Sequence, residues 1–587
     1  MRIRPRPLAL AAFLLLGACA PAGPPRASAP ASADAVLPPG VVEAVAPASA
    51  PARSDRGMVV SAHVLASRIG DEVLRKGGNA VDAAIATGFA LAVVYPTAGN
   101  IGGGGFMVLR FPDGRVTALD FREKAPLAAH PEMWLDSAGR YDEERHHFSH
   151  MAVGVPGTVA GFALAHQRYG SLPWADVVEP AVRLATDGFI MTPELAASLR
   201  AILPDLRRYP ASVAAYSRNG VPWEAGDTVR FPDLGRTLAR IRDQGRAGFY
   251  AGETARLLVA EMERGGGLIT LADLRRYRPE EREPIRGTYR GYGVISMPPP
   301  SSGGVALVEM LNILEGYDLG AMGHNSAPYV HHLVEAMRRA YRDRAAFVAD
   351  PGFTEVPVRR LTSKEYAAGL RREIRPSEAT PSLPADLEPR LEGDQTTHYS
   401  IVDEDGLAVA TTFTLEYGYG SRIVVDGAGF LLNNQMGDFN AAPGLTTADG
   451  LIGTEPNLAR PEQRPISSMT PTILTRPDGD LFAVLGTVGG RTIINLVLQV
   501  ALNLVDFDMD VVDAVSAPRF HHQWLPDNIR MEPAFRGDPL LDDLARRGHA
   551  YRFTTPWGGV HTIRLAPDGS RLGAPDPRNE DGAAVGH

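Results

Sequence analysis

The strongest constraint in this sequence is a series of paired segments after residue 396, in which apolar and polar residues alternate. HYSIVD (398–403) and LAVATTFTL (407–415) flank the turn DEDG, and PTILTR (471–476) and LFAVLGT (481–487) flank PDGD. A third pair, RIVVD and GFLLNN, surrounds a glycine-containing corner within 422–434. Short alternating segments joined by Asp-Gly turns are typical of β-hairpins. The last third of the chain is therefore predicted to be rich in sheet.

Segments with helical periodicity surround these hairpins. Residues 59–96 contain two apolar helical segments separated by a Gly-Gly-Asn break, and residues 326–348 and 492–507 form longer helical stretches. Strand patterns occur at 106–111 and 116–123 around a Pro-Asp-Gly turn. This order predicts an α+β fold in which two sheets are sandwiched between helices.

The N-terminus has the composition of an export signal. Residues 1–18 contain three arginines followed by an apolar run, Leu8–Leu16, of about half the length needed to cross a bilayer. The tetrapeptide LGAC at 16–19 resembles the lipobox of bacterial lipoproteins, and Cys19 is the only cysteine, so it has no partner for an internal disulfide. We expect a lipoprotein signal peptide and a lipidated Cys19. Ordinary signal cleavage near Ala20 is the alternative.

Residues 19–56 consist mainly of alanine, proline, serine, valine and glycine, and are predicted to form a tether to a body that begins at residue 57. The formal charge is −9, and removal of residues 1–18, with three arginines and no acid, makes it −12. The sequence has no basic stripe. Nucleic acid is therefore not an expected partner.

Two features that could suggest a cofactor have simpler explanations. The four glycines at 102–105 are not followed by the Lys-Ser/Thr that a phosphate-binding loop requires. The adjacent histidine pairs 146/147, 331/332 and 521/522 point to different sides of a helix or strand, which does not suit chelation. We expect solvated or core histidines, and no metal or other cofactor.

The stretch DQTTHYS (394–400) contains the candidate nucleophile. An internal threonine hydroxyl is a poor nucleophile, so Thr396 could simply begin a strand. If the bond between Gln395 and Thr396 were cut, however, Thr396 would gain an α-amine with a pKa near 8, and this amine could act as base for its own hydroxyl.

Several motifs, in order along the chain from about residue 57 to the end, give the sequence a family resemblance. They are GNIGGGGFMV, DFREKAP, GVPGTVAGF, PPPSSGG, QTTHYSIVD, LLNNQMGDF, RPISSMTPTI, GTVGGRTII and DPRNEDGAAVG. In these motifs the chain resembles bacterial γ-glutamyltransferases (glutathione hydrolases), which are N-terminal-nucleophile hydrolases. The resemblance implies a four-layer αββα sandwich, and a precursor that cleaves itself into a large subunit (57–395) and a small subunit (396–587), which stay together as a heterodimer.

The resemblance also implies two acyl transfers by Thr396. Its hydroxyl first attacks the carbonyl of Gln395, and in the mature enzyme it attacks the γ-amide of a γ-glutamyl compound such as glutathione. The γ-glutamyl group then passes to water or to an amino acid or peptide. Gly489 and Gly490 match the backbone donors of the oxyanion site, and Thr414 matches a second threonine that supports the nucleophile.

The family's substrate-binding residues are carried over from the same motifs. Arg122 in DFRE matches the arginine that binds the substrate carboxylate. Ser467 and Ser468 match a serine pair that adds hydroxyl donors. Asp438 matches the acid that binds the substrate ammonium, with Gln435 nearby.

Two positions depart from the family pattern. Position 416 is Glu where many members carry Asn, and we expect this second carboxylate near Asp438 to alter acceptor use or affinity while γ-glutamyl recognition is kept. The segment 441–453 matches a lid loop, but Asp449 stands where an aromatic residue commonly closes the pocket. We expect weaker lid closure.

The sequence leaves two alternative functions open. A cephalosporin (glutaryl) acylase could use the same fold and nucleophile, but a glutaryl group has no α-amine for Asp438 and Glu416 to bind. A catalytically silent, lipid-anchored binding protein is the second alternative, and the presence of Thr396, Arg122 and Asp438 argues against it. The signal and the tether predict a bacterial envelope protein in the periplasm, anchored by its lipid to the outer membrane.

Overall fold

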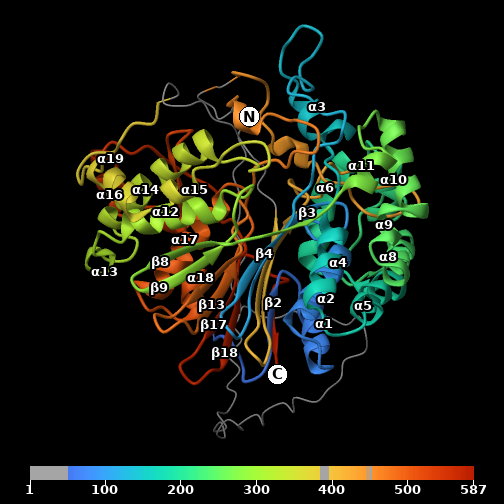
Figure 1. Ribbon diagram of the computed structural model, residues 1–587, viewed down its shortest axis with the longest axis horizontal. Coiled ribbons are helices and arrows are strands. Elements are labelled where there is room, and N and C mark those ends of the chain that lie inside the picture. Colours follow the sequence, from blue (N-terminus) through green and yellow to red (C-terminus); the bar gives the residue numbers. More distant parts are fainter. Residues whose placement is uncertain (1–49, 384–395, 446, 448–452) are drawn as a thin grey trace, which may run out of the picture. The chain divides into compact units, whose positions relative to one another are not determined.

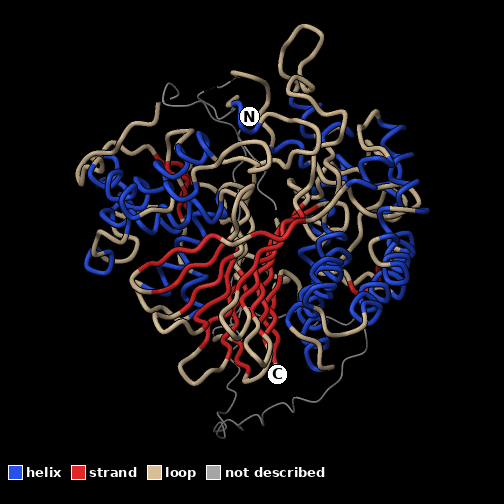
Figure 2. The backbone as a smooth tube through the Cα atoms, in the orientation of Figure 1, coloured by secondary structure: helices blue, strands red, loops and turns tan. Residues whose placement is uncertain are grey.

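Two seven-stranded sheets, antiparallel throughout, form the centre of the molecule (Figure 2). The computed structural model describes residues 50–383, 396–445, 447 and 453–587. The first sheet contains, in spatial order, β19 (Ala583–Gly586), β2 (Met58–Ser61), β10 (Thr397–Val402), β11 (Ala408–Thr414), β3 (Gly104–Arg110), β4 (Val116–Phe121) and β7 (Glu280–Arg282). The second contains β1 (Ala52–Ser54), β18 (Arg571–Pro575), β17 (His561–Leu565), β13 (Leu481–Gly486), β12 (Thr472–Thr475), β9 (Tyr292–Ser296) and β8 (Ile285–Tyr289).

Helices cover the outer face of each sheet (Figure 1). Those on or beside the first sheet are α1 (Val64–Arg75), α2 (Ala80–Val94), α4 (Thr158–Tyr169), α5 (Trp174–Asp187) and α8 (Pro232–Gln244). Those on the second sheet's side are α12 (Gly303–Leu314), α14 (Ala327–Phe347), α16 (Lys364–Arg372), α17 (Thr492–Val505) and α18 (Val511–Ser516). The predicted four-layer αββα arrangement is confirmed.

The described residues also form further helices and small strands. The helices are α3 (Glu143–His147), α6 (Pro193–Leu206), α7 (Pro210–Tyr216), α9 (Ala247–Tyr250), α10 (Gly252–Gly265), α11 (Leu271–Arg276), α13 (Leu319–Met322), α15 (Val358–Leu361) and α19 (Leu540–Arg546), with the 3-10 turn η3 (Gln435–Asp438). The small strands are β5 (Phe189–Ile190), β6 (Thr228–Val229), β14 (Phe520–His521), β15 (Ile529–Met531) and β16 (Tyr551–Phe553). No helix among the described residues is long and apolar enough to cross a membrane.

The layers follow from the two-residue period of the strands. In β3, Phe106 and Val108 belong to the core between the two sheets, whereas Met107 and Leu109 belong to the core beneath the helices. Successive side chains of a strand point to opposite faces, so a strand that is apolar on both faces can hold two layers together. This is why inner strands such as β3, β10 and β11 are buried at every position.

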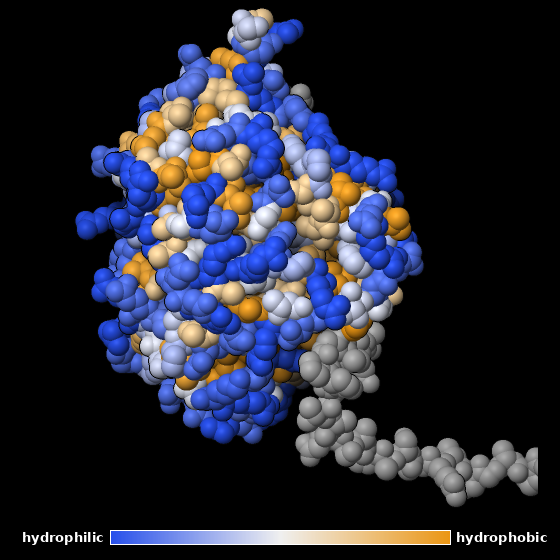
Figure 3. Space-filling view, turned by 90° about the vertical axis from the view of Figure 1, so that its right-hand side faces the viewer, coloured by the Kyte–Doolittle hydropathy of each residue, from blue (hydrophilic) through white to orange (hydrophobic). Residues whose placement is uncertain are grey.

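The outer helices are amphipathic. In α8, Leu234, Leu238 and Ile241 are buried at helical spacing, while Arg236 is exposed and Asp233 is half-buried. The face of the molecule on this side is mainly hydrophilic, with scattered hydrophobic residues (Figure 3). Burial of one apolar stripe, rather than helix propensity, fixes such a helix on the molecule.

Each sheet contains strands from before residue 396 and strands from after it, and these strands pair with one another. In the first sheet β10 pairs with β2, where Ser400 lies opposite Val60, and β11 pairs with β3. In the second sheet β12 pairs with β9. The two parts of the chain on either side of residue 396 therefore share each sheet.

Most predicted elements occur where the sequence placed them. The hairpins at 398–415 and 471–487 are β10/β11 and β12/β13, and the helical stretch at 492–507 is α17. The predicted hairpin within 422–434 is only partly right. Val424 and Leu431 form an antiparallel bridge, flanked by the backbone hydrogen bonds Leu432 N–H to Ile423 O and Val425 N–H to Phe430 O, but neither segment forms a regular strand. The two segments flank a tight corner and neither pairs with a strand of the main sheets.

Candidate active site

Thr396 lies in a pocket at one end of the first sheet. All the predicted catalytic and substrate-binding residues except Gly489 line this pocket, together with Met469 and Ile493. The lining residues are Arg122, Thr396, Thr414, Glu416, Gln435, Asp438, Ser467, Ser468, Met469, Gly490 and Ile493. Residues that are far apart in the sequence are thus brought to one place by the fold.

The β10/β11 pairing places the two threonines together. Thr397 lies opposite Phe413 in this antiparallel ladder, so Thr396, before the first strand, and Thr414, at the end of the second, lie at the same end. The amide N–H of Glu416 donates to the Thr414 hydroxyl oxygen at 2.9 Å. With that oxygen accepting a hydrogen bond, the hydroxyl proton of Thr414 can be directed elsewhere in the pocket.

An ion pair forms the part of the pocket that is predicted to bind the carboxylate and ammonium of the substrate, and we call this part the head-group site. Arg122, just after β4, donates through Nη2 to Asp438 Oδ2 and to the carbonyl of Ile466 (2.8 Å), and is 1% exposed. Gln435 Nε2 donates to the same Asp438 oxygen at 2.5 Å. A buried guanidinium and a carboxylate side by side present the two charges needed to bind a carboxylate and an ammonium.

Glu123 lies against Arg122 and was missed by the sequence analysis. It is fully buried, and its Oε2 is 3.6 Å from Arg122 Nη1. Burial raises the pKa of Glu123 to about 8, although the Arg122 charge opposes this shift. The carboxyl is therefore largely neutral at pH 7, and Arg122 keeps its charge for other partners. An acid directly after the substrate-binding arginine was the signal that could have revealed it.

The serine pair is held by a turn and a helix. Ser302 donates its amide N–H and its hydroxyl to the carbonyl of Ser467, at 2.8 and 2.7 Å. Arg344, on α14, donates to the hydroxyl oxygens of Ser302 (2.8 Å) and Ser468 (3.0 Å). Arg344 is a second residue that the sequence analysis missed. Its guanidinium connects the PPPSSGG turn to the serine pair.

Gly489 and Gly490 form the turn before α17. Their φ angles are +127° and +54°, a region that side-chain-bearing residues rarely adopt. The carbonyl of Gly489 accepts from the Thr492 N–H at 3.0 Å and from its hydroxyl at 2.7 Å. The turn lies at the positive end of the α17 dipole, which suits the stabilisation of an oxyanion.

The comparisons with known proteins agree with this geometry. The family model described as gamma-glutamyltranspeptidase matches residues 66–586. The chain belongs to the γ-glutamyltranspeptidase family. It is 44% identical to the glutathione hydrolase proenzyme of Escherichia coli (strain K12), over 99% of both chains.

Two solved structures extend the comparison of this γ-glutamyltranspeptidase-family chain. The γ-glutamyltranspeptidase of Helicobacter pylori is 43% identical, with a TM-score of 0.54, over 54% of this chain and 92% of that chain. The cephalosporin acylase of Bacillus halodurans is 28% identical, with a TM-score of 0.82, over 95% and 99%. The fold is thus shared by a protein named as a γ-glutamyltranspeptidase and one named as a cephalosporin acylase, so the fold alone does not identify the substrate.

Besides the signal peptide and residues 19–49 of the tether, three predicted site residues fall outside the described part of the chain. They are Gln395, on the acyl side of the predicted cleavage, the lipidation site Cys19, and Asp449 in the lid segment. The segment 441–453 is described only in part. These features remain predictions.

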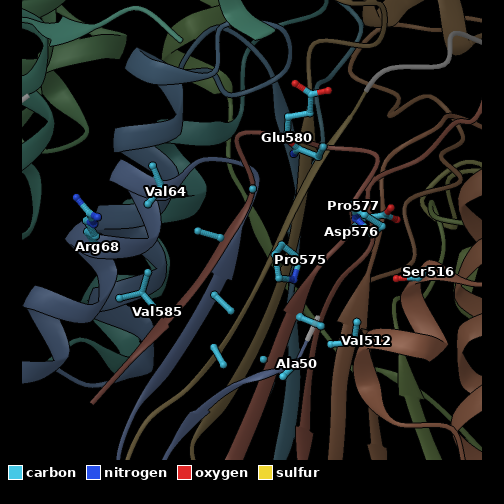
Figure 4. A pocket seen from close by; sticks show the side chains of 17 residues that line it. Ala50, Val64, Arg68, Val512, Ser516, Pro575, Asp576, Pro577, Glu580 and Val585 are labelled. Atoms are coloured by element: carbon cyan, nitrogen blue, oxygen red, sulfur yellow. The ribbon is translucent and has the colours of Figure 1, made fainter. Parts of the chain in front are cut away.

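A second, larger pocket lies between α1, α18 and the strands β18 and β19 (Figure 4). Val64, Val512 and Pro575 contribute apolar surface. Asp576 in this pocket is paired with Arg519. None of the predicted site residues is among the described residues that line it, so we assign the chemistry to the pocket around Thr396.

All three adjacent histidine pairs are buried. They are therefore core histidines, and the alternative expectation of solvated histidines is wrong. Burial lowers the pKa of His521 to about 3 and that of His522 to about 4, and it also lowers the pKa of His331 and His332. Within the described ranges, no group of three or more His, Cys, Asp or Glu side chains is placed to hold a metal ion. His147 differs from the others in contacting a residue of the pocket.

Proposed function

We propose that this chain is a self-processing γ-glutamyltransferase and glutathione hydrolase whose nucleophile is Thr396. The observation that supports this most directly is the position of the Arg122–Asp438 pair in the same pocket as Thr396 and Thr414. A γ-glutamyl group has a carboxylate and an ammonium on one carbon and the scissile amide at the other end. The pocket offers a partner for each of these three parts.

Maturation begins with attack of the Thr396 hydroxyl on the carbonyl of Gln395. The peptide C–N bond breaks, the acyl group moves to the threonine oxygen, and the former amide nitrogen becomes the α-amine of Thr396. Water then hydrolyses the ester and leaves a carboxylate at Gln395. The new amine has an ordinary pKa near 8 and can accept the proton of its own hydroxyl.

The mature enzyme repeats this chemistry on the substrate. The Thr396 oxygen attacks the γ-carbonyl while its α-amine takes the proton, and the amides of Gly489 and Gly490 bind the developing oxyanion. Collapse of the intermediate expels the amine of the leaving group, which takes up the proton. Water or the amine of an amino acid or peptide then attacks the γ-glutamyl ester and regenerates Thr396.

A glutaryl acylase activity is the second candidate, because a solved relative is named a cephalosporin acylase. A glutaryl group is a γ-glutamyl group without the ammonium. It would leave the carboxylates of Asp438 and Glu416 without a cationic ligand in a pocket where both are largely buried, which is costly. The γ-glutamyl substrate is therefore favoured.

We also propose the assembly and the location of the mature protein. Cleavage before Thr396 would give a large subunit, 57–395 with its preceding tether, and a small subunit, 396–587, that remain associated as a heterodimer. A lipid on Cys19 would anchor the enzyme to the periplasmic side of the outer membrane. There it would act on γ-glutamyl substrates such as glutathione. The proposal for location rests on residues 1–56 of the sequence.

Intact mass and activity test the proposal together. We expect protein made without residues 1–18 to give two fragments, the smaller beginning at Thr396, and to release p-nitroaniline from γ-glutamyl-p-nitroanilide. Thr396→Ala should stay a single inactive chain. An uncleaved wild-type chain, or an active Thr396→Ala chain, would refute Thr396 as the nucleophile.

A further inference from the structure

His147 and Glu416 form a buried pair behind the pocket. His147 Nδ1 lies 3.4 Å from Glu416 Oε1, and the two side chains are 2% and 3% exposed. The ring of Tyr417 is stacked on His147, with centroids 5.3 Å apart and an interplanar angle of 25°. The contact joins α3 to the end of β11, two segments that are distant in the sequence.

Glu416 adopts a strained backbone. Its φ is +84°, in the left-handed region where a residue other than glycine is uncommon. This conformation lets its N–H donate to Thr414, while its side chain is among the groups that line the pocket. The strained residue thus links the threonine that supports the nucleophile to the head-group site.

The same pair packs against the turn that presents Asp438. A Cβ atom on Gly437 would lie 2.5 Å from both His147 Nδ1 and Glu416 Oε2, so only glycine fits between the pair and η3. His146 supports the turn as well, because its Nε2 is 3.0 Å from the carbonyl oxygen of Met436. Helix α3 therefore holds η3, which carries Gln435 and Asp438.

Charge gives the pair a further role. Arg122, Asp438 and Glu416 together carry one positive and two negative formal charges, and an isolated excess charge in a buried site is costly. A proton on His147, whose Nδ1 lies 3.4 Å from Glu416 Oε1, would balance the second carboxylate. The balanced pocket then matches the α-carbon end of a γ-glutamyl group, whose carboxylate and ammonium also cancel.

We propose that His147 is a positioning residue for γ-glutamyl recognition, which places and charge-balances Glu416 so that Asp438 and Glu416 can both face the substrate ammonium. The proposal rests on the proposed function and adds to it a residue outside the carried-over motifs. It explains how position 416 can be Glu: the opposing charge is supplied from α3. His147 is not among the described residues that line the pocket, and it would act through Glu416.

A double-mutant cycle tests this role with γ-glutamyl-p-nitroanilide as donor. His147→Asn keeps a donor near the Nδ1 position but removes the charge, and Glu416→Gln removes the opposite charge. We expect each single variant to raise KM about fivefold or more and to leave kcat within about twofold of wild type. A fivefold change in KM corresponds to roughly 1 kcal/mol of binding free energy. The double variant should lie closer to wild type than either single variant, because the charges again balance.

Two comparisons separate this role from a structural one. His332→Gln, at a buried histidine of α14, is the matched control and should leave KM unchanged. With glutaryl-p-nitroanilide, which lacks the ammonium, Glu416→Gln should raise rather than lower kcat/KM. A loss of kcat alone, or additive effects in the double variant, would overturn the proposal.

The experiment also distinguishes this inference from the proposed function. An inactive wild-type protein would refute the function itself. An active wild type whose KM is unchanged by His147→Asn would refute only the role of His147. If His147→Asn does not fold, His147→Gln combined with Glu416→Gln provides the same test, since rescue relative to Glu416→Gln alone is the expected result and its failure overturns the proposal.

Discussion

At the scale of single residues, the ion pair between Arg122 and Asp438 would let the site select a zwitterion under the proposed function. The carboxylate of a γ-glutamyl group can bind Arg122 while its ammonium binds Asp438. The buried ion pair between Arg122 and Asp438 is then replaced by one ion pair from each residue to the ligand, and no charge is left unpaired. A singly charged ligand would satisfy only one member of the pair.

Replacement of Arg122 tests this arrangement. Arg122→Lys keeps the charge but loses the planar guanidinium, whose Nη2 contacts Asp438 and the carbonyl of Ile466 while its Nε contacts the carbonyl of Pro465. We expect KM for γ-glutamyl-p-nitroanilide to rise at least about tenfold, because charge-assisted hydrogen bonds of this kind are worth roughly 1.5–3 kcal/mol. Steady-state kinetics at fixed pH measure the effect. An unchanged KM would show that Arg122 does not bind the substrate.

Glu123 predicts a pH dependence of substrate binding. Its pKa is raised to about 8, so the carboxyl is neutral below that pH and becomes charged as the pH rises through it. The charged form, 3.6 Å from Arg122, competes with the substrate carboxylate, so KM should increase above about pH 8. Glu123→Gln should remove this increase while leaving KM at pH 7 nearly unchanged.

The same group affects stability. The folded protein holds the Glu123 proton more tightly than the unfolded chain, whose carboxyl has a pKa near 4.5, so stability falls as the pH rises from 4.5 towards about 8. Glu123→Gln cannot lose a proton. The melting temperature of the variant relative to wild type should therefore be higher at pH 8 than at pH 5. A pH-independent difference would contradict the shifted pKa.

At the scale of elements, helix α14 supports the substrate site from outside the pocket. Arg344 bonds to Ser302 and Ser468 through two arms of one guanidinium, which a lysine cannot reproduce. We expect Arg344→Lys to raise donor KM several-fold, up to about tenfold, with a smaller effect on kcat. Arg342→Lys, on the same helix and paired with Asp343, is the matched control and should behave as wild type.

Some helices and strands were predicted correctly from the sequence and others were not. The hairpin β10/β11 and helix α17 were predicted, because their period and their Asp-Gly or Gly-Gly boundaries are local properties. Strand β2 was missed because it is only four residues long and leads directly into helical sequence. The segments around Val424 were predicted as a hairpin because alternation alone does not show whether a neighbouring strand is available.

At the scale of the whole molecule, the interleaved sheets predict that cleavage does not separate the subunits. Strands β10 and β11 lie between β2 and β3, and the pairs β2/β19, β9/β12 and β1/β18 also join the two parts of the chain. Separation would therefore break five ladders and expose both apolar cores. We expect the two fragments to elute as one species in size-exclusion chromatography and to unfold together. The Thr396→Ala chain, uncut, is the control. Fragments that separate under native conditions would contradict the prediction.

The sequence by itself determined the nucleophile candidate, the fold class and the motif residues of the site, because these depend on local patterns and on a family resemblance. Only the tertiary structure decided which charges meet. Arg122 and Asp438 are brought together across more than 300 positions, Glu123 is buried beneath them, and His147 reaches Glu416 from another helix. Burial and charge pairing depend on the distances between segments in space, and the spacing of residues along the chain does not specify them.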